Sequence, residues 1–224
     1  GYKINRAGDN AAGLAISESM RSQINGLNQA SANAKDAIGL IKTAEGALSE
    51  VHSMLQRMTT LAEQAANGTY NTVARGNIQE EYKALTKEIK RISENADFNG
   101  IKPLTTGKEM TMTFQIGPTS GETITVDKED IYGKTVTAAM SLKLSVQNDA
   151  KNALKTIKTA IDDVSTYRAK LGAAQNRLEH TVKSLDIMSE NITEAESRIR
   201  DTDMADEITA FTKNNILLQA AQSM

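Results

Sequence analysis

The residues best suited to acid–base or metal chemistry are the two histidines, His52 and His180. Both fall on polar positions of the heptad repeats described below, e for the first and f for the second. The chain has no cysteine, so it offers no disulfide framework, thiolate metal site or cysteine nucleophile. We therefore interpret both histidines as solvated surface residues rather than metal ligands.

Other motifs that would support binding or catalysis are incomplete. Gly107-Lys108 and Gly133-Lys134-Thr135 lack the upstream glycine that a phosphate-binding P-loop requires. No G-x-S-x-G elbow or H-E-x-x-H pair occurs. The acidic run Asp127-Lys-Glu-Asp130 has no EF-hand frame and indicates a charged turn. We predict that the protein is not an enzyme and needs no cofactor or metal.

Composition narrows the possible partners. A net charge of −2, no Trp, three Phe and scattered Lys and Arg argue against nucleic-acid binding. No apolar run approaches the roughly 20 residues that span a bilayer, so we predict no membrane segment. Two prolines in 224 residues, beside abundant Ala, Lys, Glu and Gln, are typical of long helices.

The first third of the chain carries an unbroken a/d heptad series, which predicts a coiled-coil-like helix. Its members alternate spacings of three and four: Leu27, Ala30, Ala34, Ala37, Ile41, Ala44, Leu48, Val51, Leu55, Met58, Ala62 and Ala65. Asp9 or Asn10 is expected to cap the start of this helix, and Asn67-Gly68 is expected to end it.

Two further elements follow this helix. A shorter amphipathic helix is predicted from about Thr72 to Asn95, before the strong turn signal Asn99-Gly100. Residues 110–116 and 122–126 then favour strands around a Gly-Pro-rich turn, which predicts a β-hairpin.

Helical patterning returns from about Ala138. One heptad grid holds Leu154, Ile157, Ile161, Val164, Leu171, Leu178, Val182, Leu185, Ile192 and Ile199. Polar residues fill its other slots, where they cost stability but help to fix register. These polar residues are Arg168, Gln175, Ser189 and Glu196. Asp201-Thr-Asp203 interrupts the pattern and is expected to cap a final helix.

The predicted fold is mainly α, an elongated rod of long, coiled-coil-like antiparallel helices with a small β-hairpin region. We divide the chain into an N-terminal helical part (1–105), a hairpin and connecting segment (106–137), a long C-terminal helix (138–200) and the start of a terminal helix (201–224). At 1.5 Å per residue, a helix of about 55 residues is roughly 80 Å long. Such rods suit structural material better than catalysis.

Several segments together resemble bacterial flagellin. INRAGDNAAGLAIS (4–17), GLNQASANAKDAI (26–38) and TAEGALSEV (43–51) are similar to its N-terminal helices. LGAAQNRLEHTV (171–182) and SRIRDTDMADEI (197–208) are similar to its C-terminal helical region. ADFNGIKPL and FQIGPTSGETITV resemble the segments between, so the resemblance covers nearly the whole chain in order.

The resemblance implies a structural subunit of the flagellar filament, secreted through the flagellar channel and located in the bacterial flagellum. Its implied partners are other flagellin subunits, an export chaperone and the export apparatus. The sequence resembles a core fragment that lacks the extreme terminal segments, which form the filament's inner tube in this family. We therefore expect this chain alone to stay soluble and to form no native filaments.

The resemblance also implies a receptor-binding site. In flagellins recognised by animals, the corresponding helix face binds the innate immune receptor Toll-like receptor 5. The matching residues are Gln56, Arg57, Leu61, Gln64 and Glu81. In the stretch LQRMTTLAEQ (55–64), Thr59, Thr60 and Glu63 replace the Arg, Glu and Val of the family's LQRVRELAVQ, which leaves the strength of binding and signalling open.

Two alternatives stay open at this stage. Leu61 lies outside the a/d series, at position g, and packing against the second helix of its own bundle would explain it without a receptor. Another secreted helical-rod protein, such as a hook–filament junction or secretion-needle tip protein, would share the heptads and the lack of cysteine. It would not share the many matches in order.

Overall fold

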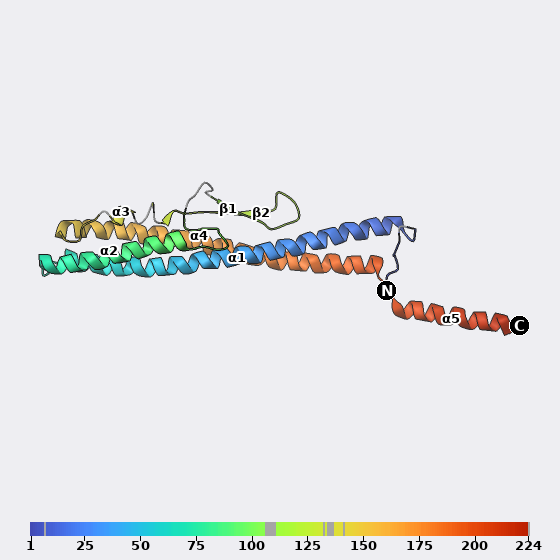
Figure 1. Ribbon diagram of the computed structural model, residues 1–224. Coiled ribbons are helices and arrows are strands. Elements are labelled where there is room, and N and C mark those ends of the chain that lie inside the picture. Colours follow the sequence, from blue (N-terminus) through green and yellow to red (C-terminus); the bar gives the residue numbers. More distant parts are fainter. Residues whose placement is uncertain (7, 106–110, 132, 134–136, 141, 224) are drawn as a thin grey trace. The chain divides into compact units, whose positions relative to one another are not determined.

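The structure, a computed structural model, describes residues 1–224 except 7, 106–110, 132, 134–136, 141 and 224 (Figure 1). Its described elements are, in order, α1 (Ala11–Ala66), α2 (Thr72–Asn95), β1 (Thr111–Gln115), β2 (Thr123–Asp127), α3 (Thr137–Met140), α4 (Gln147–Arg200) and α5 (Met204–Ser223). The predicted fold class, mainly helical with one hairpin, is confirmed. The candidate motifs at Gly107-Lys108 and Lys134-Thr135 lie outside the described residues.

Helix α1 begins where the sequence predicts. The Asn10 side chain is its cap, because its Oδ1 accepts a hydrogen bond from the Gly13 backbone N–H at 2.9 Å. Asp9 does a different job: its Oδ2 accepts from the backbone N–H groups of Asn5 and Arg6 at 3.0 and 2.9 Å. Of the two predicted capping residues, Asn10 is therefore the one that caps α1.

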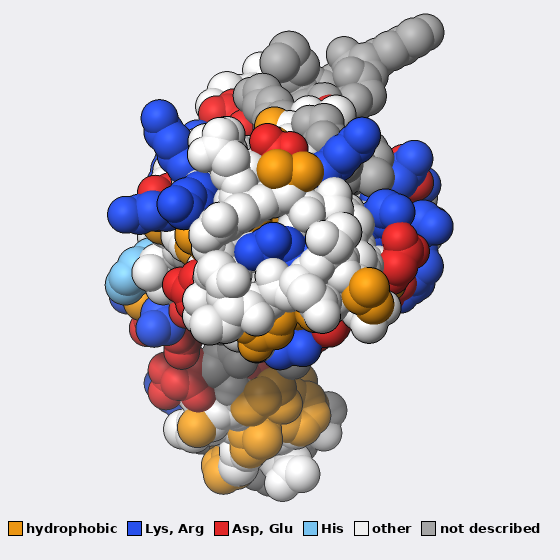
Figure 2. Space-filling model, turned by 90° about the vertical axis from the view of Figure 1, so that its left-hand side faces the viewer, with side chains coloured by type: hydrophobic (Ala, Val, Ile, Leu, Met, Phe, Trp, Pro, Cys, Tyr) orange, Lys and Arg blue, Asp and Glu red, His pale blue; other side chains and the backbone are white. Residues whose placement is uncertain are grey.

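The end of α1 falls at Ala66, as expected, but Gly68 does not take the left-handed conformation common at such ends. Side chains cap the last carbonyls instead. Arg75 donates to the carbonyls of Ala65 and Asn67 at 2.9 and 3.0 Å, and Gln147 donates to that of Ala66 at 2.9 Å. Figure 2 views the molecule from the left-hand side of Figure 1, the end at which this turn lies. Backbone and uncharged polar side chains, drawn in white, cover much of the centre of that view.

The chain forms two compact units that do not follow its linear order. Unit 1 contains residues 1–32, 117–119 and 183–224, and unit 2 contains residues 33–116 and 120–182. Each unit thus combines segments from the two long helices. The domain boundaries predicted from the sequence, after residues 105, 137 and 200, divide the chain by its linear order. The two compact units do not test these boundaries, which stay a proposal.

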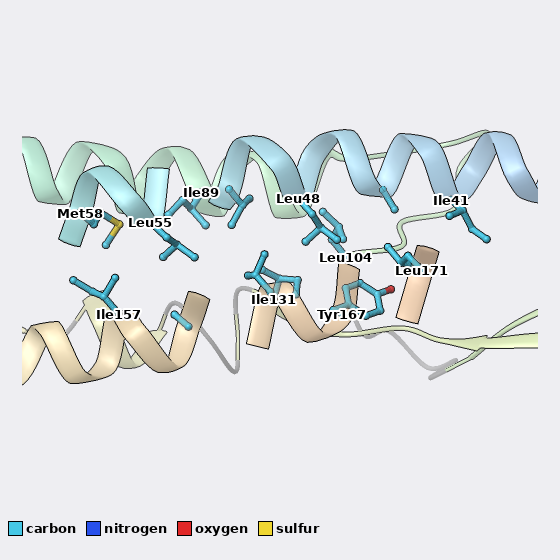
Figure 3. Close-up of a cluster of buried hydrophobic side chains, with 14 of the residues drawn as sticks. Ile41, Leu48, Leu55, Met58, Ile89, Leu104, Ile131, Ile157, Tyr167 and Leu171 are labelled. Atoms are coloured by element: carbon cyan, nitrogen blue, oxygen red, sulfur yellow. The ribbon is translucent and has the colours of Figure 1, made fainter. Parts of the chain in front are cut away.

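In unit 2, helices run antiparallel. Gln147 at the start of α4 contacts Ala66 at the end of α1, whereas Arg168 further along α4 lies 3.5 Å from Glu45, earlier in α1. Between the helices, apolar side chains make one continuous core. Figure 3 shows part of it, with Leu48 of α1 facing Leu104 and Ile131 from the connecting segments.

The α1 face outside the a/d series is also covered. Leu40, Ala47, Met54 and Leu61 stand at seven-residue intervals, and all four are buried or packed against the unit 2 core. Leu61 is 1% exposed. These four residues therefore face the interior of unit 2, in agreement with the bundle-packing alternative for Leu61.

The β-hairpin joins the same core. β1 and β2 pair antiparallel, with Met112 opposite Val126 and Phe114 opposite Ile124. Met112, Ile124 and Val126 are at most 6% exposed, and intervening residues of β2 face outward. Alternation with a period of two thus buries one face, as the pattern predicts. The first residue of the predicted hairpin, Met110, lies outside the described part.

Unit 1 has a more polar seam between α1 and α4. Ser17 donates to Glu196 at 2.8 Å, and Ser189 donates to Asn28 at 2.9 Å. A third bond joins Ser31 Oγ to Asp186 Oδ1 at 2.8 Å. The buried apolar cluster at this seam is small: it consists of Leu27, Ala30 and Leu185, with Ile192 packed against it. The predicted polar heptad positions 189 and 196 therefore bond to the facing helix, which supports their role in fixing register.

The start of α4 differs from the prediction. The sequence pattern predicts a helix from about Ala138, whereas the described residues form the four-residue α3 at this place and α4 begins at Gln147. The backbone N–H of Leu144 donates to the buried Oε1 of Gln79 in α2. This hydrogen bond and the burial of Leu144 favour a connecting segment over a continuous helix.

The final helix is capped as predicted. Asp203 Oδ1 accepts from the backbone N–H groups of Ala205 and Asp206 at 2.9 and 3.3 Å. All residues of α5 whose side chains are described are exposed, although several are apolar. The large ones are Met204, Ile208, Phe211, Ile216, Leu217 and Leu218. Within the described part of the chain, none of the helices is both long and apolar enough to cross a membrane.

Two buried tyrosines make stability sensitive to high pH. Burial raises the pKa of Tyr82 and of Tyr167 to about 12, and the hydroxyl of Tyr167 also donates to the Pro103 carbonyl at 3.2 Å. In the unfolded chain both would ionise near pH 10. Their contribution to stability is therefore complete below about pH 10 and is lost as the pH rises towards 12, by roughly 2–3 kcal/mol for each tyrosine.

We expect alkaline unfolding, followed by circular dichroism against pH, to begin above pH 10 and to shift upward in Tyr167→Phe. Tyr2→Phe is the matched control, because this ring is 62% exposed. An unchanged transition in Tyr167→Phe would show that this phenol does not drive alkaline unfolding.

Candidate receptor-binding face

The candidate site centres on an ion pair between α1 and α2. Arg57 Nε donates to Glu81 Oε1 at 2.8 Å, with the two side chains 50% and 45% exposed. The hydrogen bond to Glu81, followed by the attraction of its charge, raises the pKa of the Arg57 guanidinium. The charged Arg57 side chain is thus paired with Glu81 at the surface.

The turn between the helices explains why these two residues meet. Asn71 caps α2 by accepting a hydrogen bond from the Ala74 N–H at 2.8 Å, and Arg75 ties the first turn of α2 to the end of α1. The number of residues from Arg57 to the end of α1 equals the number from the start of α2 to Glu81. Antiparallel helices with a short turn bring such positions level with each other.

The other predicted site residues are placed unequally. Gln56 is exposed and Gln64 is half-buried, so both are accessible on α1. Leu61, by contrast, is 1% exposed and belongs to the unit 2 core. The resemblance places Leu61 in the receptor-binding site, but its side chain lies in the core and is not available to a partner at the surface.

Thr59 and Thr60, at which this stretch departs from the family pattern, turn back onto their own helix. Thr59 Oγ1 donates to the Leu55 carbonyl at 3.0 Å, and Thr60 Oγ1 donates to the Gln56 carbonyl at 3.3 Å. Their hydroxyls are thus already used by α1. Next to Arg57, the surface has short neutral side chains where the family pattern has an Arg and a Glu.

The environment of His52, beside this face, differs from the one that the sequence predicts. His52 was expected to be a solvated surface residue, but it is half-buried, and its Nε2 lies 3.0 Å from Gln56 Nε2. The i,i+4 spacing of the two residues could have indicated the contact. His180 is exposed, and among the described residues no group of three or more His, Asp and Glu is placed to hold a metal ion.

Models of two protein families match the chain. The bacterial flagellin N-terminal helical region matches residues 1–109, and the bacterial flagellin C-terminal helical region matches residues 154–224. The first covers the whole of α1 and α2, and therefore every residue of the candidate face. The second covers most of α4 and all of α5.

Two curated relatives align with the full chain. A flagellin of Halalkalibacterium halodurans is 48% identical, with 100% of this chain and 82% of the relative covered. A flagellin of Bacillus subtilis is 47% identical, with 100% of this chain and 84% of the relative covered. The similarity thus extends across both units and the hairpin.

Solved structures share the fold. The crystal structure of Bacillus cereus flagellin matches with a TM-score of 0.63 at 30% identity, covering 80% of this chain and 94% of the other. A putative flagellar hook-associated protein from Vibrio parahaemolyticus matches with a TM-score of 0.75, covering 86% of this chain and 100% of the other. Its identity is 13%, so this second likeness shows the fold alone.

Proposed function

Because this chain belongs to the bacterial flagellin family and is an exported structural subunit of the flagellar filament, we propose that its face around Arg57 and Glu81 is bound by Toll-like receptor 5. The half-exposed Arg57–Glu81 pair carries the proposal. Gln56 and Gln64 extend this surface along α1. We call the surface formed by Gln56, Arg57, Gln64 and Glu81 the Arg57 face.

The geometry of Arg57 suits recognition of a carboxylate or a carbonyl. Among the described residues, Nε is the only Arg57 nitrogen that donates a hydrogen bond, and Glu81 accepts it. The two terminal nitrogens of the guanidinium are thus left for a partner, in the planar fork that favours paired hydrogen bonds. Because Glu81 already orients the side chain, less conformational entropy is lost on binding.

The proposed role is structural and not catalytic, and it extends to further partners. The chain belongs to a family of filament subunits, so contacts with other copies are its principal assembly interactions. We propose that the exposed apolar residues of α5, including Phe211 and Leu217, are covered by such copies in the filament. Before assembly, the export chaperone and the export apparatus are the proposed partners.

Filament growth tests the assembly role. We expect the full-length protein, seeded with filament fragments, to give long filaments by electron microscopy. Phe211→Glu, at a ring 67% exposed, should reduce growth while leaving thermal stability unchanged, because this side chain contributes little to the single chain's packing. Normal growth of the variant would remove α5 from the assembly surface.

Receptor binding is tested first by removing the partner that orients Arg57. We expect Glu81→Ala to weaken binding to the Toll-like receptor 5 ectodomain by roughly fivefold, which corresponds to about 1 kcal/mol. The measurement is surface plasmon resonance with the immobilised ectodomain. The melting temperature should change little, because exposed ion pairs typically contribute about 0–1 kcal/mol.

Glu88→Ala is the matched control on the same helix. Glu88 also bonds to an arginine, Arg91, in an exposed pair, but it is not among the residues of the Arg57 face. Equal binding by the Glu81 and Glu88 variants, or no binding by the parent protein, would contradict the proposed site.

A further inference from the structure

Asparagine followed by glycine occurs three times in the chain, at Asn25-Gly26, Asn67-Gly68 and Asn99-Gly100. This pair is chemically labile because a glycine has no side chain to hinder attack by its own backbone nitrogen on the preceding asparagine side chain. The structure places the three pairs in different surroundings. We propose that Asn67 is a site of spontaneous deamidation and isomerisation, and that the fold protects Asn25 and Asn99.

The reaction needs only water and a base from solvent. A base removes the Gly68 amide proton, and the nitrogen attacks Cγ of Asn67 to form a five-membered succinimide. The Cγ–Nδ2 bond breaks, and Nδ2 takes up a proton and leaves as ammonia. Water then opens one of the two imide carbonyls, giving aspartate or isoaspartate. The net change is the hydrolysis of one side-chain amide, with no oxidant or reductant.

The local geometry at Asn67 favours the first step. Residues 67–69 are exposed and lie outside the helices. Asn67 Oδ1 accepts a hydrogen bond from the Thr69 N–H at 3.2 Å, which folds the side chain back over the Gly68 peptide. Negative charge develops on this same oxygen when Cγ is attacked. The Thr69 N–H thus stabilises the developing charge, as an oxyanion-hole donor does.

Asn25 lies in the opposite situation. The pair Asn25-Gly26 is inside α1, where the Gly26 N–H belongs to the helical hydrogen-bond ladder and the backbone is fixed. Pro118 also packs closely here, with its Cβ 3.0 Å from the position that a Gly26 Cβ would occupy. Attack on Asn25 would require local unfolding of α1.

Asn99 is protected from this reaction by the hydrogen bonds of its turn. Asn99 and Gly100 have φ angles of 52° and 83°, and the flanking Phe98 and Ile101 exchange two backbone hydrogen bonds of 3.0 Å. The Gly100 N–H, which would have to lose its proton, donates to Asp97 Oδ2 at 3.0 Å. A carboxylate at this distance disfavours a negative charge on that nitrogen.

Reaction at Asn67 would alter the junction of α1 and α2. The Asn67 carbonyl accepts one of the two Arg75 hydrogen bonds that cap α1. An aspartate here adds a negative charge at a helix C-terminus, where the macrodipole disfavours it. In isoaspartate the backbone runs through Cγ, and the former Asn67 carbonyl that Arg75 binds becomes a free carboxylate. The modification therefore changes both the backbone and the charge at the cap that joins the two helices.

The test is a time course on the folded protein at mildly alkaline pH in ¹⁸O-labelled water, followed by peptide mapping with mass spectrometry. Label should appear in the peptide containing residue 67 at least roughly tenfold faster than in the other two, a difference equivalent to about 1.36 kcal/mol in barrier. In denaturant the three rates should converge, because the proposed protection comes from the fold.

Two variants separate the causes. Thr69→Pro removes the N–H that bonds to Asn67 Oδ1 and should slow reaction at Asn67, with a melting curve to verify folding. Asp97→Ala frees the Gly100 N–H and should speed reaction at Asn99 without changing Asn67. Equal rates at the three pairs in the folded protein, or faster reaction at Asn99 than at Asn67, would overturn the proposal.

Discussion

Leu48→Ala is expected to lower the free energy of unfolding by about 2–5 kcal/mol, the usual range for a buried leucine cut back to alanine. Leu48 is 0% exposed and belongs to the continuous core of unit 2. Leu104 and Ile131 face it from connecting segments, and α4 lies opposite (Figure 3). Because helices and connecting segments surround the site, the cavity can close only partly.

Leu185→Ala should cost less, near the lower end of the same range. Leu185 is 6% exposed and packs in a small cluster with Leu27 and Ala30. Fewer apolar neighbours surround it, and the adjacent seam in unit 1 is held by hydrogen bonds of polar side chains. The loss on truncation scales with the contacts removed and the cavity left.

Denaturation midpoints in urea measure both effects, with His180→Ala as an exposed control expected to change stability by about 0.5 kcal/mol or less. His180 lies on α4 in unit 2, and its side chain is exposed. If all three variants unfold at the same urea concentration, the heptad assignment of the core is wrong.

Local periodicity explains why so much of the fold could be predicted. The a/d series from Leu27 to Ala65 is buried throughout, because a regular spacing of three and four leaves a helix one consistent face to bury. The caps at Asn10 and Asp203 also depend on neighbours within three residues. Such features need no knowledge of distant parts of the chain.

Features that depend on distant segments were not predictable in this way. The stripe that contains Leu61 is buried by segments that follow in the chain, and its heptad position alone does not fix what covers it. The break before Gln147 involves a buried hydrogen bond between Leu144 and Gln79, 65 residues apart. The resemblance named Arg57 and Glu81 as members of one site, but their hydrogen bond depends on how α2 folds back along α1, which the charges alone do not specify.

Arg57→Ala is expected to weaken binding to the receptor ectodomain by roughly thirtyfold. Loss of an interface arginine typically costs about 2 kcal/mol, and each 1.4 kcal/mol corresponds to a tenfold change in Kd. Truncation removes both the free fork of the guanidinium and its bond to Glu81. Surface plasmon resonance gives the affinity, and a melting curve on the same variant gives stability. The melting temperature should hardly change, because the Arg57 side chain is half exposed and outside the core.

Arg91→Ala is the matched control, since Arg91 also bonds to a glutamate on an exposed helix surface but lies outside the Arg57 face. The Arg91→Ala variant should bind like the parent protein.

Leu61→Ala tests whether Leu61 contacts the receptor or only supports the Arg57 face. Because Leu61 is buried, this variant should have a lower melting temperature, and any loss of binding should follow from movement of the Arg57 face. Parent-like affinity in Arg57→Ala would place the receptor contact elsewhere. Early melting of Arg57→Ala would instead make the Arg57–Glu81 bond a structural link between α1 and α2.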